Sequence, residues 1–179
     1  MKLMIISDIH GIINNLEFIK EEFIKEKCDK LVVLGDLYYI GPINRMMNDY
    51  DISYVEKFLE SFKDKLICIQ GNCDSEVDLE FSNFSIIKGL SIVKTDTKEL
   101  YITHGHIFNE TNWDRKNTIL IFGHYHIPFI KEIGNNLFIN PGSISIPKDN
   151  HKPSYLIFEE NKCTIYDIDK EIIAEKSME

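Results

Sequence analysis

Residues 30–36 read K-L-V-V-L-G-D, an uninterrupted apolar run that ends in a glycine and an aspartate. A strand that is apolar along its whole length, rather than at every second residue, has both of its faces buried. Strands of this kind belong to parallel sheets that are covered on both sides. The stretch therefore predicts an inner strand of an α/β domain, with Asp36 just beyond its carboxyl end.

Two further apolar runs flank this one in the sequence. Residues 2–6 lead into Ser7 and Asp8, and residues 66–69 lead into Q-G-N-C-D at 70–74. Between the three runs, residues 14–24 and 53–62 carry apolar side chains at helical spacing. The first half of the chain thus alternates strand and helix, as in parallel sheets. Each predicted helix begins with a capping box, which pairs Asn14 with Glu17 and Ser53 with Glu56.

The second half of the chain predicts strands and turns with little helix. Turn residues at 134–136 and 160–162 indicate hairpins. After Ile173 the sequence becomes polar, and we expect that tail to fray. Residues 1–179 are therefore predicted to form a single α/β domain with two sheets packed as a sandwich. The predicted strands of this half are residues 84–88, 90–94, 99–103, 118–122, 130–133, 137–139, 155–159 and 163–167.

Composition and charge argue against several classes of partner. The chain has 179 residues, of which 44% are hydrophobic and 27% charged, as is typical of one globular domain. Its formal net charge is −9, and no cluster of lysine and arginine stands out. A long nucleic acid or an anionic membrane needs such a basic track, so neither is expected as a partner. Neither a P-loop motif nor G-x-G-x-x-G occurs, so nucleotide-fuelled and hydride-transfer chemistry have no support.

The cysteines and the first residues predict a compartment. Four cysteines are scattered without a C-x-x-C pair, as is typical of free thiols in a reducing environment. The apolar run at 2–6 is too short for the core of a signal peptide or for a membrane span. We therefore predict a cytoplasmic protein.

Polar side chains collect where the predicted strands end. In open α/β sheets, ligands bind in the crevice at the carboxyl ends of the strands. Carboxylates and imidazoles brought together there would lack a counter-charge without a cation, so the pattern predicts a metal site. Their number suggests two ions, and mixed oxygen and nitrogen donors suit hard or borderline divalent metals. The side chains are Asp8, His10, Asp36, Asn72, Asp74, His104, His106, His124 and His126.

The order of these motifs resembles that of a known family. D-x-H, G-D, G-N-x-D, G-H and G-H-x-H follow one another as in the calcineurin-like metallophosphoesterases, and the resemblance extends over essentially the whole chain. The runs at 71–78, 103–106 and 140–148 are similar in particular to those of small bacterial phosphodiesterases of the YfcE type. The resemblance implies a two-sheet β-sandwich flanked by helices in four layers, α/β/β/α.

The resemblance also implies ligands for two divalent metal ions. Asp36 would bridge the two ions through its carboxylate. Relatives favour Mn²⁺, with Ni²⁺, Co²⁺, Zn²⁺ and iron as alternatives. One ion would be held by Asp8, His10 and His126, and the other by Asn72, His104 and His124.

The pair His124 and His126 has a geometric interpretation. Residues two apart at the end of a strand project the same way, with Tyr125 between them pointing away. Each imidazole can then serve a different ion of a pair that lies roughly 3.5–4 Å apart. Gly123, which has no Cβ, permits a close approach of the backbone.

The implied activity is metal-dependent hydrolysis of a phosphoester. A two-metal centre lowers the pKa of a bound water toward about 7, so the resemblance implies a phosphodiesterase that attacks small phosphoesters with a water or hydroxide held on that centre. Asp36, Asn72 and His104 would take part as catalytic ligands, and His106 would assist the leaving group. Relatives form dimers or tetramers, which implies a homo-oligomer.

The chain departs from the family at two places. Many relatives have a histidine at the position of Cys73, and a thiol with a pKa near 8.5 is a poor substitute for an imidazolium acid. Asp74 would then hold the metal shell or the loop. YfcE-type proteins tend to carry a histidine and an arginine where this chain has Ile40 and Ile43, and Arg45 is close enough to replace the lost cation. This second departure bears on substrate range more than on activity.

Alternatives remain open for the function and for two segments. A binding scaffold such as the retromer subunit has the same fold with a degraded metal site, whereas all seven ligand positions are filled here, which favours the enzyme. A nuclease of the same superfamily has less support because the chain is acidic. Residues 140–143 form either a plain turn or a wall of the active site. Trp113 either packs against the protein or flanks the substrate.

Overall fold

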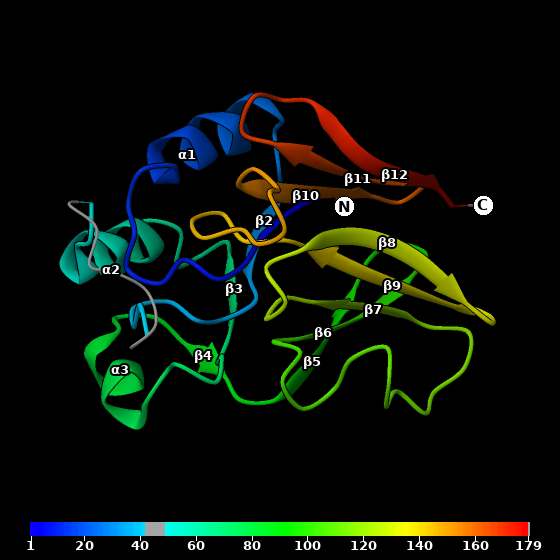
Figure 1. Ribbon diagram of the computed structural model, residues 1–179, viewed down its shortest axis with the longest axis horizontal. Coiled ribbons are helices and arrows are strands. Elements are labelled where there is room, and N and C mark those ends of the chain that lie inside the picture. The colour runs from blue at the N-terminus through cyan, green and yellow to red at the C-terminus, as the bar shows by residue number, and fades with distance from the viewer. Residues whose placement is uncertain (42–48, 179) are drawn as a thin grey trace.

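Two β-sheets pack face to face in the computed structural model, which describes residues 1–41 and 49–178 (Figure 1). The first sheet has seven strands in the order β12-β11-β10-β1-β2-β3-β4, and the second has five in the order β5-β6-β7-β9-β8. A buried cluster that includes Leu3, Val32, Ile102 and Ile121 draws side chains from both sheets and forms the core between them. The predicted two-sheet sandwich is therefore confirmed.

The first sheet contains the parallel strands predicted from the first half of the sequence. β1, β2, β3 and β4 pair in parallel in this order, and β10 joins the other side of β1 in antiparallel orientation. β11 and β12 continue the antiparallel part, so the predicted fraying after Ile173 is wrong. The strands are β1 (Leu3–Ile6), β2 (Lys30–Val33), β3 (Leu66–Ile69), β4 (Ile86–Ile87), β10 (Ser154–Glu159), β11 (Lys162–Asp167) and β12 (Ile172–Ser177).

The second sheet has a parallel centre and antiparallel edges. β6, β7 and β9 run parallel, while β5 and β8 pair antiparallel with their neighbours. Each strand lies within two residues of its predicted place. The strands are β5 (Leu90–Lys94), β6 (Glu99–Thr103), β7 (Ile119–Phe122), β8 (Pro128–Ile133) and β9 (Asn136–Pro141).

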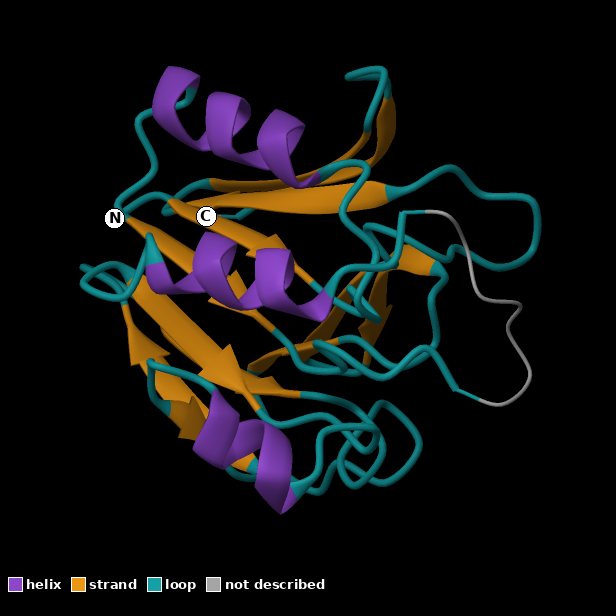
Figure 2. Cartoon of the chain, turned by 90° about the vertical axis from the view of Figure 1, so that its left-hand side faces the viewer, coloured by secondary structure: helices purple, strands orange, loops and turns teal. Residues whose placement is uncertain are grey.

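Helices cover the outer face of the first sheet. α1 (Leu16–Lys25) and α2 (Ile52–Glu60) bury apolar side chains such as Ile19 and Leu59 against Met4 and Val33 of the strands. Figure 2 shows these helices and α3 (Glu76–Phe81) in front of the strands.

The helix starts differ from those predicted. α1 has Asn15 at its N-cap without a side-chain cap, because the Asn15 amide instead donates to the carbonyl of Ile144. Asp51, rather than Ser53, caps α2 by accepting from the backbone N–H of Tyr54. α3 was not predicted, although Ser75 and Asp78 form a full capping box at its start.

The outer face of the second sheet is covered by an irregular segment. Residues 104–118 contain no helix, and Trp113 from this segment packs edge-on against Tyr101 at 5.3 Å while its Nε1 donates to Thr118. This contact supports the packing interpretation of Trp113. The predicted fold class of two sheets flanked by helices holds, and on this outer face the covering segment is irregular.

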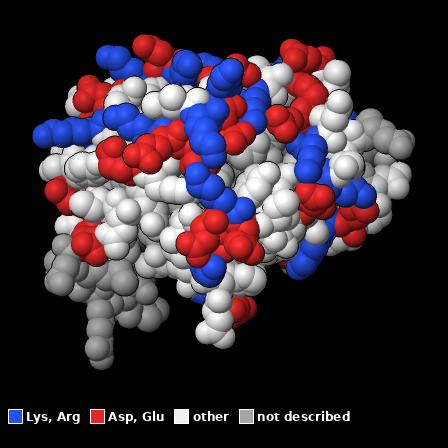
Figure 3. All heavy atoms as spheres, turned by 90° about the horizontal axis from the view of Figure 1, so that it is seen from above, with Lys and Arg blue, Asp and Glu red and all other residues white. Residues whose placement is uncertain are grey.

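No helix among residues 1–41 and 49–178 is long and apolar enough to cross a membrane. On the face seen in Figure 3, acidic and basic side chains are interspersed, as the mixed-sign sequence predicts.

Candidate metal centre

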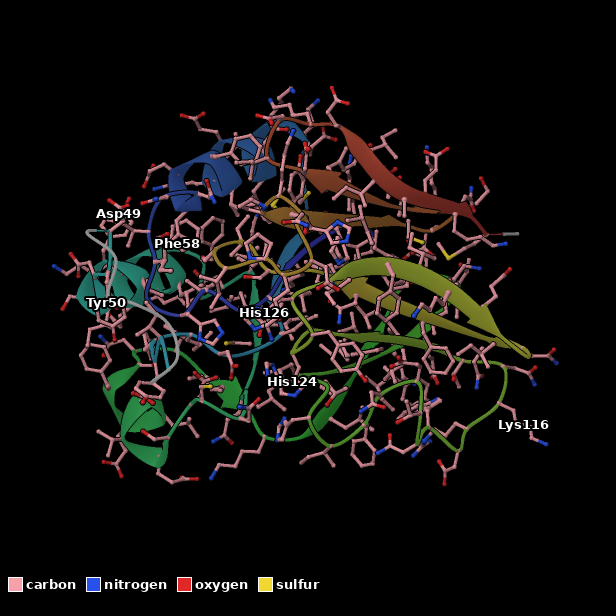
Figure 4. All side chains as sticks on the ribbon, viewed as in Figure 1. Asp49, Tyr50, Phe58, Lys116, His124 and His126 are labelled. Atoms are coloured by element: carbon pink, nitrogen blue, oxygen red, sulfur yellow. The ribbon has the colours of Figure 1, made fainter. Side chains whose placement is uncertain are left out.

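The carboxyl ends of five strands from both sheets meet at one edge of the sandwich. The loops after β1 and β2 are joined by hydrogen bonds from the N–H of Asp8 to the carbonyl of Gly35 and from the N–H of His10 to that of Asp36. Those after β6 and β7 are joined by a bond from the N–H of Gly123 to the carbonyl of His104. Figure 4 places His124 and His126 near the middle of the molecule, where these loops converge.

All seven predicted ligand side chains lie in this cluster. Asp8, His10 and His126 form one group whose ligand atoms lie within 4.8 Å of one another, and Asp36, His104 and His124 form a second. Asp36 contacts both halves, because its Oδ2 lies 3.6 Å from Nε2 of His10 and 3.4 Å from Nε2 of His104. The Oδ1 atom of Asn72 lies 3.0 Å from the same atom of His104.

Three imidazoles are oriented by backbone carbonyl groups. Nδ1 of His10 lies 2.6 Å from the carbonyl oxygen of Tyr39, Nδ1 of His104 lies 2.7 Å from that of Leu34, and Nδ1 of His126 lies 2.7 Å from that of Ile146. A carbonyl oxygen only accepts, so Nδ1 carries the proton in each ring. The lone pair of a neutral ring is then on Nε2, which faces the carboxylates. Metal-binding histidines are typically fixed in this way.

Two buried atoms at the centre have no hydrogen-bond partner in the described part of the chain: Oδ1 of Asp8 and Nε2 of His10. Asp8 is fully buried and His10 is 4% exposed. Buried polar atoms are rarely left without a partner, and both atoms here are electron-pair donors. A divalent cation between them would satisfy both, so the residues present fit the metal ions that the motifs predict.

Asp36 and His104 shift each other's pKa in opposite directions. Burial alone would raise the pKa of Asp36, but the hydrogen bond and charge of His104, together with the backbone N–H of Cys73, outweigh burial and lower the pKa. Burial would likewise lower the pKa of His104, yet the hydrogen bond and charge of Asp36 raise it to about 9. A divalent ion would therefore compete with a proton for Nε2 of His104.

Five of the seven predicted ligands have left-handed backbone. The φ angles are 57° at Asp8, 52° at His10, 57° at Asp36, 67° at His124 and 62° at His126. This conformation is uncommon in residues other than glycine, and it clusters at functional sites. His124 and His126 therefore lie in a loop beyond β7 and not in extended strand geometry, which corrects the geometric interpretation of this pair. Tyr125 packs against the ring of Phe122, at 5.5 Å.

A layer of hydrogen bonds supports the ligand loops. The buried carboxylate of Asp74 accepts from the backbone N–H groups of Asp36, Leu37 and Gly71 at 2.7–2.8 Å, so it holds the loops after β2 and β3 together. Gly123 permits the expected close approach, because a Cβ there would overlap Ser7 Oγ and lie 2.8 Å from Asp8 Oδ2.

The turn at residues 140–143 backs the site. Asn140 donates to the carbonyl of Gly123 at 2.7 Å, and Ser143 donates to the carbonyl of Asp8 at 2.8 Å. Both side chains are fully buried. The segment is therefore more than a plain turn, since it positions two loops of the centre.

His106 and Cys73 lie at the rim of the cluster. The His106 ring is exposed, 5.4 Å from the ring of His104, and burial together with the charge of His104 lowers its pKa. Cys73 forms a third ligand group with His10 and Asp36, and its N–H donates to Asp36 Oδ1 at 2.8 Å. Burial and the charge of Asp36 raise the pKa of its thiol to about 12, so the thiol is protonated at neutral pH.

Sequence reasoning missed one residue that lines the cavity at the centre. This cavity, of about 410 Å³, is lined by Lys148 as well as by Ile40, Cys73 and several of the predicted ligands. The backbone N–H of Lys148 donates to the carbonyl of His126 at 3.0 Å, which fixes its place beside the ligands. The sequence offered a signal, because the run 140–148 ends in this lysine. Ile43 and Arg45 lie outside the described residues.

The chain belongs to the calcineurin-like phosphoesterase superfamily, whose domain matches residues 1–162. It is 36% identical to phosphodiesterase YfcE of Escherichia coli K12 over 98% of this chain and 97% of the relative. The solved structure of YfcE from E. coli superimposes with a TM-score of 0.94 at 35% identity and covers all of both chains. Phosphodiesterase MJ0936 of Methanocaldococcus jannaschii is 28% identical over 79% of this chain and 83% of the relative.

The fold also occurs in a trafficking protein. Vacuolar protein sorting 29 from Cryptosporidium parvum superimposes with a TM-score of 0.63 at 20% identity, covering 99% of this chain and 98% of the other. This likeness concerns the fold alone. The family and the phosphodiesterases among the relatives make this chain a phosphoric ester hydrolase.

Proposed function

We propose that the protein is a metal-dependent phosphodiesterase that hydrolyses small phosphoesters at a dinuclear centre. The observation that carries the proposal is the convergence of seven ligand side chains, with Asp36 in contact with both halves of the cluster. The buried, unpartnered atoms of Asp8 and His10 support a cation at the same place. The phosphodiesterases among the relatives support the reaction type.

The proposed ligands divide between two divalent ions. Asp36 would bridge them, and the mixed oxygen and nitrogen donors suit Mn²⁺, with Ni²⁺, Co²⁺, Zn²⁺ and iron as alternatives. Asp8, His10 and His126 would hold one ion, and Asn72, His104 and His124 the other.

The residues of the chain then have distinct tasks in the reaction. Divalent ions at such a centre lower the pKa of a water toward neutrality and offset charge on the phosphoryl oxygens. The carbonyl groups of Tyr39, Leu34 and Ile146 keep the imidazole lone pairs aimed inward. Cys73 is a weak acid here, so His106 at the rim is the residue proposed to give a proton to the leaving oxygen.

Lys148 is the proposed anion-binding side chain of the cavity. It lines the same wall as Ile146 and Pro147, and its backbone is tied to His126. A phosphodiester carries one negative charge at neutral pH. The ammonium of Lys148 would attract that charge as the substrate approaches.

The test is hydrolysis of bis-p-nitrophenyl phosphate by metal-depleted protein supplied in turn with Mn²⁺, Ni²⁺, Co²⁺, Zn²⁺ and Mg²⁺. We expect activity to require a metal. In Asp36→Asn we expect both the activity and the bound metal, measured by elemental analysis, to be lost. Asp64→Asn, an exposed residue between α2 and β3, is the matched control that should keep both. Activity that survives both metal removal and Asp36→Asn would contradict the proposed mechanism.

The remaining expectations are part of the same proposal. We propose one domain over residues 1–179 that acts in the cytoplasm, as a homo-oligomer, on small substrates rather than on long nucleic acids or membranes. A metal-binding scaffold for protein partners is the rival function, and a protein that is inert with every metal yet binds a partner would favour it. Ligand completeness supports the enzyme over this rival.

A further inference from the structure

A second cavity, of about 330 Å³, adjoins the metal centre. It is lined by Tyr38, Tyr39, Tyr50, Ile52, Cys73, Ser75 and Asp78. Cys73 also lines the cavity that contains the proposed ligands, so the two cavities share a wall. Three tyrosines around one hollow beside a phosphoester site give flat aromatic surface within reach of the reacting group.

Tyr39 is attached to the metal centre through its backbone. Its carbonyl oxygen accepts from Nδ1 of His10 at 2.6 Å, so the same peptide unit orients a proposed ligand and positions the tyrosine. The Tyr39 side chain is nevertheless 49% exposed. The Tyr39 ring is therefore accessible to a ligand, while the backbone that carries it is held by the bond to His10.

Tyr50 is seated on the loop that carries His10. It forms a β-bridge with Ile12, and its neighbours Asp49 and Asp51 bond to Ile13 and Gly11. A Cβ at Gly11 would overlap the Tyr50 ring, and Gly11 has φ 74°, so a glycine next to His10 lets the ring pack on bare backbone. Figure 4 shows Tyr50 beside α2, on the same side of the two labelled histidines as that helix.

Tyr38 forms the rigid floor of the cavity. It is 2% exposed, its hydroxyl shares a hydrogen bond of 2.6 Å with Ser82, and its ring meets Phe81 edge-on at 5.7 Å. The cavity thus combines one fixed tyrosine with two that present accessible ring surface.

We infer that this tyrosine cavity binds a flat aromatic group of the phosphoester substrate, as a nucleoside would supply. The inference rests on the proposed function, because the metal centre would hold the phosphate of the same molecule. Stacking on tyrosine rings is strong for any planar base and needs no fixed hydrogen-bond pattern. Nucleoside and other aryl phosphates share this chemistry.

The test compares ligands that differ only in the ring. Adenosine 5′-monophosphate and ribose 5-phosphate carry the same phosphate and sugar, and their binding to the Mn²⁺-loaded protein is measured by calorimetry. We expect the nucleotide to bind roughly 10- to 100-fold more tightly, the range that base stacking supplies. Phenyl phosphate against methyl phosphate, as a second pair, distinguishes a general aryl preference from one for a nucleoside.

Matched variants assign the effect to the cavity. Tyr39→Leu and Tyr50→Leu should each reduce the nucleotide advantage several-fold, while Tyr39→Phe and Tyr50→Phe, which keep the ring, should retain it. Binding of ribose 5-phosphate should change less than twofold in all four. Tyr54→Leu, on α2 but outside the cavity lining, is the control.

Each outcome decides the inference. Equal affinity of the two members of each pair overturns it, and so does a ring-dependent advantage that persists in both leucine variants. If the leucine variants change the oligomeric state in ultracentrifugation and leave nucleotide affinity unaltered, the cavity is a contact between copies and the inference is wrong. Hydrolysis of bis-p-nitrophenyl phosphate by the wild-type protein is followed in parallel. Inactivity with every metal rejects the proposed function, whereas the ring-dependent binding is measured without turnover and is judged by itself.

Discussion

At the scale of single residues, five proposed ligands occupy backbone that most side chains avoid. His124, with φ 67°, is one of them. For residues with a Cβ, the left-handed region costs roughly 1–2 kcal/mol, and glycine escapes most of that cost. The backbone of the site is therefore strained, and the surrounding hydrogen bonds hold it in this conformation.

Replacement of His124 should expose this strain. In metal-free protein we expect His124→Gly to be more stable to urea than His124→Ala by about 1 kcal/mol, since both lose the imidazole and only alanine retains a Cβ. The same pair at Tyr125, which is not among the positive-φ residues, is the control and should favour alanine. An alanine variant at 124 that equals or exceeds the glycine variant would contradict the argument.

Lys148 offers a second test at this scale. We expect Lys148→Ala to raise KM for bis-p-nitrophenyl phosphate about fivefold, equivalent to about 1 kcal/mol, because an exposed cation contributes no more than that to an anion. Bound metal should be unchanged. Lys116→Ala, in the loop before β7, is the control (Figure 4). An equal effect of both variants on KM would mean that Lys148 has no specific role in substrate binding.

The sequence predicted which side chains gather at the site better than it predicted their geometry. Residue type and order were enough to place Asp8, Asp36 and His126 in one cluster, which the structure shows. The left-handed φ angles and the inward aim of Nε2 depend on bonds to carbonyl groups far away in the chain, such as Ile146 for His126. No local pattern records those partners.

At the scale of elements, β12 is the clearest departure from the sequence prediction. Its polar residues suggested a frayed tail, but Ile173 and Ala174 pack against the core between the sheets, while Ile172 is 55% exposed. Lys176 of this strand also pairs with Glu132 of β8 at 2.9 Å. An edge strand with one buried face has too few apolar residues to stand out in a sequence.

Adjacent substitutions in β12 should have unequal effects. We expect Ile173→Asp to lower the free energy of unfolding by about 2 kcal/mol, because it places a charge against the core, and Ile172→Asp to change it by less than about 0.5 kcal/mol. Urea titrations at pH 7 measure both. Equal small effects would mean that the tail is not packed in solution.

The helix starts illustrate a different limit of sequence reasoning. A side-chain cap at the start of α2 was predicted correctly, but its position was wrong by two residues. Asp51, not Ser53, offers the capping oxygen at the true start. Asn15 lost its capping role to a tertiary bond with Ile144. Competition between equivalent local partners is settled by packing, which a window of sequence does not contain.

At the scale of the whole molecule, Glu160 joins the two sheets at the edge opposite the metal centre. It lies in the turn between β10 and β11, and its carboxylate accepts from Thr95, Asp96 and Thr97 in the turn between β5 and β6. Partial burial opposes the charged form, but these hydrogen bonds outweigh it and lower the pKa to about 2.

This contact predicts a pH-dependent stability. A carboxyl group whose pKa is lowered on folding stabilises the fold above its unfolded pKa, near 4.5, and loses that effect as the pH falls toward 2. We expect Glu160→Gln to cost about 1–2 kcal/mol at pH 7, and the difference from wild type to shrink between pH 5 and pH 3. Glu80→Gln, on α3, is the control, and a difference that stays constant with pH would refute the assignment.

The three N–H groups gathered by Asp74 have a consequence for how the protein acquires its metals. These bonds join the loops after β2 and β3 through protein atoms alone. We therefore expect the proposed ligands to keep their places when metal is removed, so that loading requires no folding step. Chelation should therefore leave the cooperative unfolding transition in place, and the amide hydrogens of Leu37 and Gly71 should remain protected from exchange in metal-free protein. If the loops hold their shape in this way, different divalent metals should enter the site without a change in the fold.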